Sequence, residues 1–336
     1  MTPGELREAV SALGGREFNA GQIFAWLHRG ARSFDEMTDI SKAFRETLKE
    51  RYYIAPPELA QRRESKLDGT VKYLWRLRDG ETVESVVMGY KHGNTVCVSS
   101  QAGCRMGCAF CASTLGGLSR DLLPSEILDQ VIFSEKDCGR KLSNIVLMGI
   151  GEPLDNFENV TRFLELVSDP GGMNFGMRHI SLSTCGLTEK VDKLGESGLQ
   201  LTLSVSLHAP DDLTRTRLMP VNKAGGVAAL MDSCRRYFGK TGRRVSFEYA
   251  LIDGVNDTAR HAKELVRLLR GAPWHLNLIL LNNVAERELR PSSRENAAAF
   301  TKILTEGRVN FTFRRRLGAD IDAACGQLRR SSARSG

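Results

Sequence analysis

The sequence predicts an α/β protein in which a partial (β/α)6 barrel follows an N-terminal helical accessory domain and a β-hairpin extension. Three patterns along the 336 residues support this architecture. Apolar residues recur every three or four positions up to residue 53, and they alternate with polar ones over residues 71–88. From residue 95 onward, short apolar β-type runs are separated by helical stretches.

The N-terminal region has the helical pattern. Leu6 and Val10 fall on one helical face, and Asp39-Ile40-Ser41 provides a start signal for a later helix. Pro56-Pro57 ends the pattern, because proline restricts the preceding backbone to extended conformations. We therefore expect a helical accessory domain over residues 1–55.

A linker and a β-hairpin are expected over residues 56–94. Val71, Tyr73, Trp75 and Leu77 alternate with Lys72, Leu74 and Arg76, and Asp79-Gly80 is a favoured turn dipeptide. Thr82–Met88 then provides the returning strand.

Residues 95–315 are expected to form the partial barrel. The predicted strands are 95–99, 144–149, 179–183, 200–207, 244–251 and 275–281, with a seventh at 309–314. The predicted helices are 124–136, 158–168, 226–237, 258–270 and 294–305. About six strand–helix units are fewer than the eight of a complete barrel. In such barrels chemistry gathers at the carboxyl ends of the strands.

The composition is that of a globular protein, with 41% hydrophobic and 26% charged residues. No run approaches the ~18 apolar residues of a membrane span, and the N-terminus has no signal-peptide stretch. We expect a cytoplasmic protein with no membrane partner. The net charge is +7, and arginines cluster at 314–316 and 329–330. These clusters suit a nucleic-acid backbone, although a solvated basic tail explains them equally well.

Cys104, Cys108 and Cys111 carry the strongest chemical signal. Their Cys-x3-Cys-x2-Cys spacing lets three thiolates reach one metal centre. A cubane iron–sulfur cluster normally takes four thiolates, so three would leave one iron open to another ligand. The alternative is structural zinc, which usually uses two Cys/His pairs, and no second pair follows here. The spacing therefore favours a [4Fe-4S] cluster.

Polar residues stand at the ends of the other predicted strands. A carboxylate could hold an ammonium group, and hydroxyls and amides could bond a ribose or an adenine. The same hydroxyls also serve as helix caps, and a histidine there is often purely structural. These strand-end candidates are Gly151, Glu152, Ser183, Ser206, His208 and Asn282.

Two further cysteines lie outside these strand ends. Cys97 is expected to be buried and to act only as a small hydrophobic residue. Cys325 lies in a loop of small residues with arginine on both sides, where a thiol is expected to be reactive. An inconsequential surface thiol is the alternative for Cys325.

Taken together, these motifs resemble the radical S-adenosylmethionine (SAM) enzymes, and most closely the RlmN/Cfr group of RNA adenine methyltransferases. The matching blocks cover nearly the whole chain, and the C-terminal block is specific to this group. They are Val96–Cys104, Met148–Leu154, Ser206–Pro210 and Asp320–Leu328.

The resemblance implies a role for each matching residue. Cys104, Cys108 and Cys111 would bind the [4Fe-4S] cluster of a radical SAM barrel. SAM contacts would come from Gly151, Glu152, Ser183, Ser206, Leu207, His208 and Asn282. Cys325 would be the cysteine that becomes methylated, and Cys97 would later form a disulfide bond with it. Glu84 would be a proton acceptor, with Cys97 as the alternative base.

The resemblance also implies the reaction. One SAM methylates Cys325, and an electron from the cluster cleaves a second SAM to a radical that activates the methyl group. The target is carbon 2 of an adenosine in 23S rRNA, and in some members also of the adenosine following the anticodon in tRNA. The N-terminal helices would help to grip RNA, residues 316–336 would carry the methyl acceptor, and a flavodoxin-like or ferredoxin-like donor would reduce the cluster. We expect a monomer.

Two alternatives and one departure accompany this interpretation. Methylation at adenine carbon 8 is the alternative within the group, and Pro153 favours carbon 2. A non-catalytic nucleic-acid-binding protein with a structural metal is the alternative from another class. Leu280 stands where the group usually has proline, which affects the expected geometry around Asn282.

Overall fold

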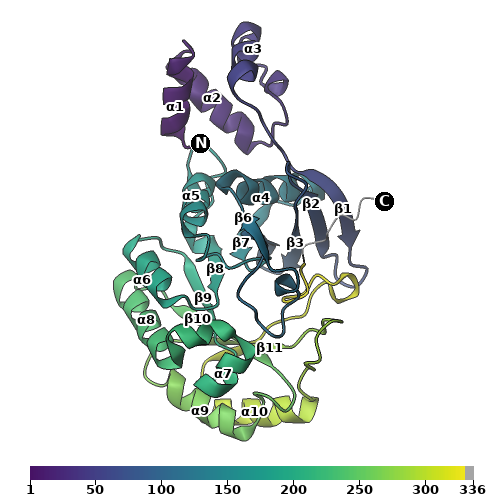
Figure 1. Ribbon diagram of the computed structural model, residues 1–336, viewed down its shortest axis with the longest axis vertical. Helices are drawn as coiled ribbons and strands as arrows, with labels where there is room; N and C mark the ends of the chain where they lie inside the picture. Colours follow the sequence, from purple (N-terminus) through teal and green to yellow (C-terminus); the bar gives the residue numbers. More distant parts are fainter. Residues whose placement is uncertain (330–336) are drawn as a thin grey trace.

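The computed structural model of the protein describes residues 1–329 (Figure 1). It has the predicted order of N-terminal helices, β-hairpin extension and partial barrel. Arg330 of the basic cluster and the rest of the tail lie outside the described residues.

The helical region contains α1 (Pro3–Ala12), α2 (Glu17–His28) and α3 (Lys42–Arg51), with a 3-10 turn at Phe34–Glu36. Ser41 caps α3 by accepting the Phe44 amide, as the start signal predicts. Figure 1 shows these helices at one end of the molecule, next to α4 and α5.

The β-hairpin extension joins the barrel sheet. Its strands are β1 (Glu58–Glu64), β2 (Val71–Arg76) and β3 (Thr82–Tyr90), and β3 pairs antiparallel with β4 (Gly93–Cys97). The β2–β3 hairpin is confirmed. The sequence analysis missed β1, because this edge strand is almost entirely polar and exposed and has no apolar alternation.

Seven parallel strands form the partial barrel and lie side by side in chain order. They are β4, β7 (Leu142–Leu147), β8 (Ile180–Thr184), β9 (Thr202–Ser206), β10 (Val245–Leu251), β11 (His275–Leu280) and β12 (Phe311–Phe313). All seven predicted strands are therefore confirmed, with ends shifted by a few residues.

Helices connect these strands, as expected for a parallel sheet. They are α4 (Pro124–Cys138), α5 (Phe157–Ser168), α6 (Thr188–Glu196), α7 (Asp212–Leu218), α8 (Gly226–Thr241), α9 (Ala259–Leu269) and α10 (Arg294–Glu306). Short 3-10 turns occur at Ala112–Thr114, Met177–His179, Pro220–Ala224 and Ala319–Ile321. The sequence analysis missed the short helices α6 and α7. None of the helices in residues 1–329 combines the length and hydrophobicity that a membrane crossing requires.

A separate two-stranded sheet frames the loop that carries the three clustered cysteines. Its strands are β5 (Gln101–Gly103) and β6 (Leu118–Asp121), and residues 104–117 connect them. Gly103 has φ +87°, and a Cβ there would collide with the Gly117 carbonyl oxygen. Only glycine fits at this close crossing.

Candidate active site

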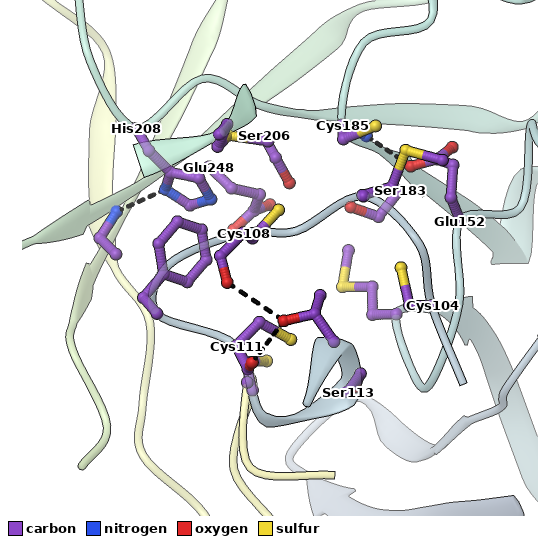
Figure 2. Close-up of a pocket in the computed structure, with 18 of the residues that line it drawn as sticks. Cys104, Cys108, Cys111, Ser113, Glu152, Ser183, Cys185, Ser206, His208 and Glu248 are labelled. Atoms are coloured by element: carbon purple, nitrogen blue, oxygen red, sulfur yellow. Dashed lines mark hydrogen bonds between the residues drawn. The ribbon is translucent and has the colours of Figure 1, made fainter. Parts of the chain in front are cut away.

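One cavity at the carboxyl ends of the parallel strands collects most of the predicted site residues (Figure 2). It is lined by Cys104, Cys108, Cys111, Gly151, Glu152, Ser183, Ser206, His208, Asn282 and Cys325. Three predicted residues, Cys97, Leu207 and Glu84, are buried elsewhere.

The loop of residues 104–117, here called the cysteine loop, is fixed at several points. The Cys104 amide donates to the Gly117 carbonyl at 3.0 Å and closes the loop at its base. The Thr114 hydroxyl donates to the carbonyls of Cys108 and Cys111, and Figure 2 shows these two contacts as dashed lines. Arg287 donates to the Cys111 carbonyl at 3.2 Å. The backbone that presents the thiols is therefore ordered by the protein itself.

The three thiols could provide the donor set of an iron–sulfur cluster. Burial raises the pKa of Cys104 to about 12, and burial together with the neighbouring cysteines raises the pKa of Cys108. A buried thiolate therefore needs positive charge nearby, which a bound metal centre supplies. Among residues 1–329, no three His, Cys, Asp or Glu side chains converge as around a single metal ion. The three thiols nevertheless lie on one short loop and line one cavity, so each could bind one iron of a cubane cluster.

Glu152 is buried at the end of β7 and joins two strand ends. Its carboxylate accepts the Leu154 amide at 3.0 Å and the Cys185 amide at 2.7 Å. Burial raises its pKa, and these hydrogen bonds oppose the rise. The preceding Gly151 has φ +107°, and a Cβ there would meet Gln101 at 2.6 Å.

His208 is held as a neutral acceptor at the end of β9. Its Nδ1 accepts the Ala250 amide at 2.9 Å, and its ring meets Phe110 edge-on, with centroids 4.7 Å apart. Burial lowers the pKa of His208 to about 3. Leu207 packs its side chain into the core, and its backbone links Ser206 to His208.

Asn282 follows β11 and reaches the C-terminal segment, here called the Cys325 loop (residues 317–329). Its Nδ2 donates to the Cys325 carbonyl at 3.1 Å, whereas its buried Oδ1 has no hydrogen-bond partner among the described residues. An orphaned buried acceptor facing a cavity is a place for a ligand donor.

The Cys325 loop is bonded directly to the cysteine loop. The Ala112 amide donates to the Gly326 carbonyl at 2.8 Å, and the Ser113 hydroxyl donates to the Leu328 carbonyl at 2.7 Å. Cys325 therefore lines the same cavity as three cysteines more than 200 positions earlier in the sequence.

Cys97 ends β4 behind this cavity, in an apolar cluster that includes Ile321 and Leu328 of the Cys325 loop. Burial raises the pKa of Cys97 to about 12, Cys325 raises it further, and Arg314 opposes the rise. A negative charge on Cys325 therefore disfavours a negative charge on Cys97. All eight cysteines fall within residues 1–329 and are free thiols, so the structure does not contain the expected Cys97–Cys325 disulfide.

Glu84, on β3, is engaged away from the cavity. Its Oε1 lies 2.8 Å from Lys72 Nζ, and its Oε2 accepts the Arg329 amide at 2.9 Å. Burial raises the pKa of Glu84. The structure thus brings Glu84 to the Cys325 loop and not to the cavity wall.

The sequence analysis missed Glu248 and Arg314, which also line the cavity. Glu248 Oε1 accepts from Asn277, whereas the buried Oε2 has no hydrogen bond within residues 1–329 and lies 3.8 Å from Arg314. The negative charge of a Cys325 thiolate raises the pKa of Arg314, so the guanidinium of Arg314 would stabilise that thiolate. A glutamate inside the apolar run Val245–Leu251 was the available signal, because carboxylates are rarely buried without a role.

Comparison with known proteins identifies two regions. Residues 98–269 match the radical SAM superfamily, and residues 1–54 match the ribosomal RNA large subunit methyltransferase N-terminal domain. A relative described as probable dual-specificity RNA methyltransferase RlmN, from Lachnoclostridium phytofermentans, is 50% identical over 332 residues. That match covers 98% of this chain and 93% of the relative. A relative with the same description from Alkaliphilus oremlandii is 48% identical, covering 98% and 96%.

A solved structure agrees with these sequence matches. The crystal structure of a radical SAM methyltransferase from Sphaerobacter thermophilus superposes with a TM-score of 0.93 at 43% identity. The superposition covers 98% of this chain and 97% of that one.

Proposed function

The chain belongs to the RlmN family of the radical SAM superfamily, and we propose that it is a dual-specificity RNA methyltransferase that carries the methyl group on Cys325. Its target is carbon 2 of an adenosine in 23S rRNA and of the adenosine following the anticodon in tRNA. It uses a [4Fe-4S] cluster and two SAM per methylation, and it works as a cytoplasmic monomer with a flavodoxin-like or ferredoxin-like electron donor.

One observation supports this function above the others. The Cys325 loop is hydrogen bonded to the cysteine loop, so the thiol of Cys325 shares a cavity with Cys104, Cys108 and Cys111. A metal site that only stabilised the fold would not require a further thiol in the same cavity. A methyl carrier must lie beside the group that activates it, because a reacting pair must be held within near-attack distance.

Different residues of the cavity bind the cluster and SAM. Cys104, Cys108 and Cys111 hold the cluster, which supplies the single electron that cleaves SAM when both are bound. Gly151 and Glu152 receive the amino end of SAM, and Ser183, Ser206, Leu207, His208 and Asn282 contact its remaining polar groups. Phe110 and His208 cover one wall of the cavity and restrict water there.

Cys325 and Cys97 act in sequence. The Cys325 sulfur accepts a methyl group from one SAM and loses its thiol proton. A hydrogen atom of this methyl group would pass to the 5′-deoxyadenosyl group of a second SAM, and the methyl carbon would then bond to carbon 2 of the adenine. The adduct would give up one electron, which the oxidised cluster could accept, before it loses the carbon 2 proton. Glu84 or Cys97 takes the carbon 2 proton; if Cys97 takes it, the proton must pass on to solvent. Cys97 then attacks the Cys325 sulfur as a thiolate. The sulfur–carbon bond breaks with its electron pair going to the adenine side, and the carbon is protonated to a methyl group. The resulting Cys97–Cys325 disulfide requires a two-electron reductant before another turnover.

The test is anaerobic turnover with methyl-labelled SAM, a reductant and either 23S rRNA or tRNA, followed by mass spectrometry of the nuclease-digested RNA. We expect 2-methyladenosine from both RNAs with the wild type and none with Cys325→Ala. 8-Methyladenosine in place of 2-methyladenosine would reassign the target atom. Full activity of Cys325→Ala would refute the methyl-carrier role.

A further inference from the structure

We propose that Lys72 and Glu84 form a buried clamp that holds the Cys325 loop on the β-hairpin extension, and that Lys72 is a positioning residue for Cys325. The consequence for methyl transfer rests on the proposed function of Cys325 as methyl carrier. The clamp itself rests on contacts of residues 1–329 and can be tested without cluster, SAM or RNA.

The clamp bonds to both sides of Cys325. Lys72 Nζ lies 2.8 Å from Glu84 Oε1 and donates to the Asp322 carbonyl at 3.0 Å. Glu84 Oε2 accepts the Arg329 amide at 2.9 Å. One ion pair therefore ties down the backbone three residues before Cys325 and four residues after it.

The pair is well suited to hold a loop. The side chains of Lys72 and Glu84 are only 11% and 7% exposed, so water competes little with their hydrogen bonds. They stand on the adjacent strands β2 and β3, where Lys72 is opposite Val86 and Glu84 is opposite Leu74. This diagonal placement on a paired hairpin gives the loop a rigid support.

The β1–β2 turn holds the start of the same loop. The Gly318 amide donates to Asp68 Oδ2 at 2.9 Å. The two carboxylate oxygens of Asp320 accept from the Ser65 hydroxyl at 2.6 Å and from the Lys66 amide at 3.0 Å. The C-terminal segment lies beside the hairpin strands in Figure 1. The β-hairpin extension thus contacts the Cys325 loop from Gly318 to Arg329.

The opposite side of the loop is bonded to the barrel through Asn282, Ala112 and Ser113. The Cys325 loop is therefore hydrogen bonded to the β-hairpin extension on one side and to the barrel on the other. Both oxygens of Glu84 are used by the clamp, and Glu84 does not line the cavity. This role differs from proton removal, because it is needed before any adenine is present.

The first experiment measures the loop in the metal-free protein. Hydrogen–deuterium exchange of residues 317–328 is compared between wild type, Lys72→Met and the double variant Lys72→Met/Glu84→Met. The double variant guards against misfolding, because replacing both partners of a buried ion pair by apolar residues is often tolerated. Lys193→Met is the matched control, since Lys193 pairs with Glu158 on the exposed surface. We expect exchange about tenfold faster in both clamp variants and unchanged in the control. Wild-type exchange in the folded double variant would overturn the clamp.

The second experiment measures methylation of Cys325 without RNA. Trypsin releases Leu317–Arg329, which contains Cys325 as its only cysteine, so mass spectrometry reports this residue alone. We expect the single-turnover rate constant of Cys325 methylation to fall about tenfold to a hundredfold in the double variant, with the SAM concentration that gives half of the maximal rate unchanged. A residue that only accepts the adenine proton would not affect this step, so a wild-type rate constant in the double variant would overturn the positioning role. If wild-type Cys325 is never methylated, the proposed function fails while the exchange result still decides the clamp.

Discussion

The backbone amide of Ala112 donates a 2.8 Å hydrogen bond to the carbonyl of Gly326, and this bond joins the two loops on which the proposed chemistry depends. Ala112 directly follows Cys111, and Gly326 directly follows Cys325. A shift of one loop against the other would therefore move the proposed cluster ligand Cys111 relative to the proposed methyl acceptor Cys325.

The geometry of the cysteine loop depends on Gly103. Its φ of +87° and the close approach of the Gly117 carbonyl to the position a Cβ would take leave no room for a side chain. We expect Gly103→Ala to destabilise the protein by at least about 2 kcal/mol and to lower the iron content after reconstitution. Gly116→Ala, in the same loop and with nothing within 4 Å of its Cβ, is the control and should retain its iron. Equal iron content in the two variants would contradict this account of the loop.

Asn282 should be required for methyl transfer because it lines the cavity, bonds the Cys325 carbonyl and has a buried oxygen with no hydrogen-bond partner within residues 1–329. We expect Asn282→Ala to lower the rate of RNA methylation at least about tenfold. Asn283→Ala is the matched control, since Asn283 is exposed and contributes its backbone carbonyl to Gln327. Steady-state rates with labelled SAM measure both variants. Similar losses in the two would show that Asn282 has no specific role.

Glu248 is expected to contact SAM through its Oε2, which has no hydrogen bond within residues 1–329 and lies 3.8 Å from Arg314. Glu248→Gln keeps the shape of the side chain and a carbonyl acceptor for Asn277, but it removes the charge from the cavity wall. We expect SAM affinity to fall about tenfold, because a hydrogen bond to a charged group is worth about 1.5–3 kcal/mol. Anaerobic equilibrium dialysis measures this affinity. An unchanged Kd would exclude Glu248 from the binding site.

Acid should weaken the attachment of the N-terminal helices through His28. Its Nδ1 accepts the Met173 amide at 3.2 Å, and burial lowers its pKa to about 4. The unfolded chain takes up this proton near pH 6.5, whereas the folded protein resists it until about pH 4. His28 thus adds a stability loss, at most about 1.4 kcal/mol per pH unit, as pH falls from about 6.5 to 4. His28→Gln, which keeps an acceptor without titrating, should unfold with a shallower pH dependence. Identical slopes in urea titrations would rule this out.

Local patterns predict the barrel well, because its strands are short apolar runs bounded by polar strand ends. They do not predict β1, whose sequence Glu58–Glu64 is almost entirely polar and depends on pairing with β2. The same limit explains α6 and α7, which are too short for helical periodicity to stand out.

The candidate site was predicted only in part for a related reason. The spacing of Cys104, Cys108 and Cys111 is enough to predict a metal centre. The position of Cys325 depends on long-range hydrogen bonds that no local pattern encodes. Its role was expected only from the resemblance of residues 320–328 to a known family. Glu248 lies inside β10 and Arg314 directly follows β12, so the charge of Glu248 signals a role but not that it shares a cavity with Arg314.

The most direct test of Cys325 as methyl carrier uses Cys97→Ala, which lacks the thiol proposed to release the product. After anaerobic turnover with SAM, reductant and RNA, we predict a stable RNA–protein adduct whose tryptic peptide Leu317–Arg329 carries adenosine on Cys325. Normal turnover by Cys97→Ala, or an adduct on any other residue, would contradict the account.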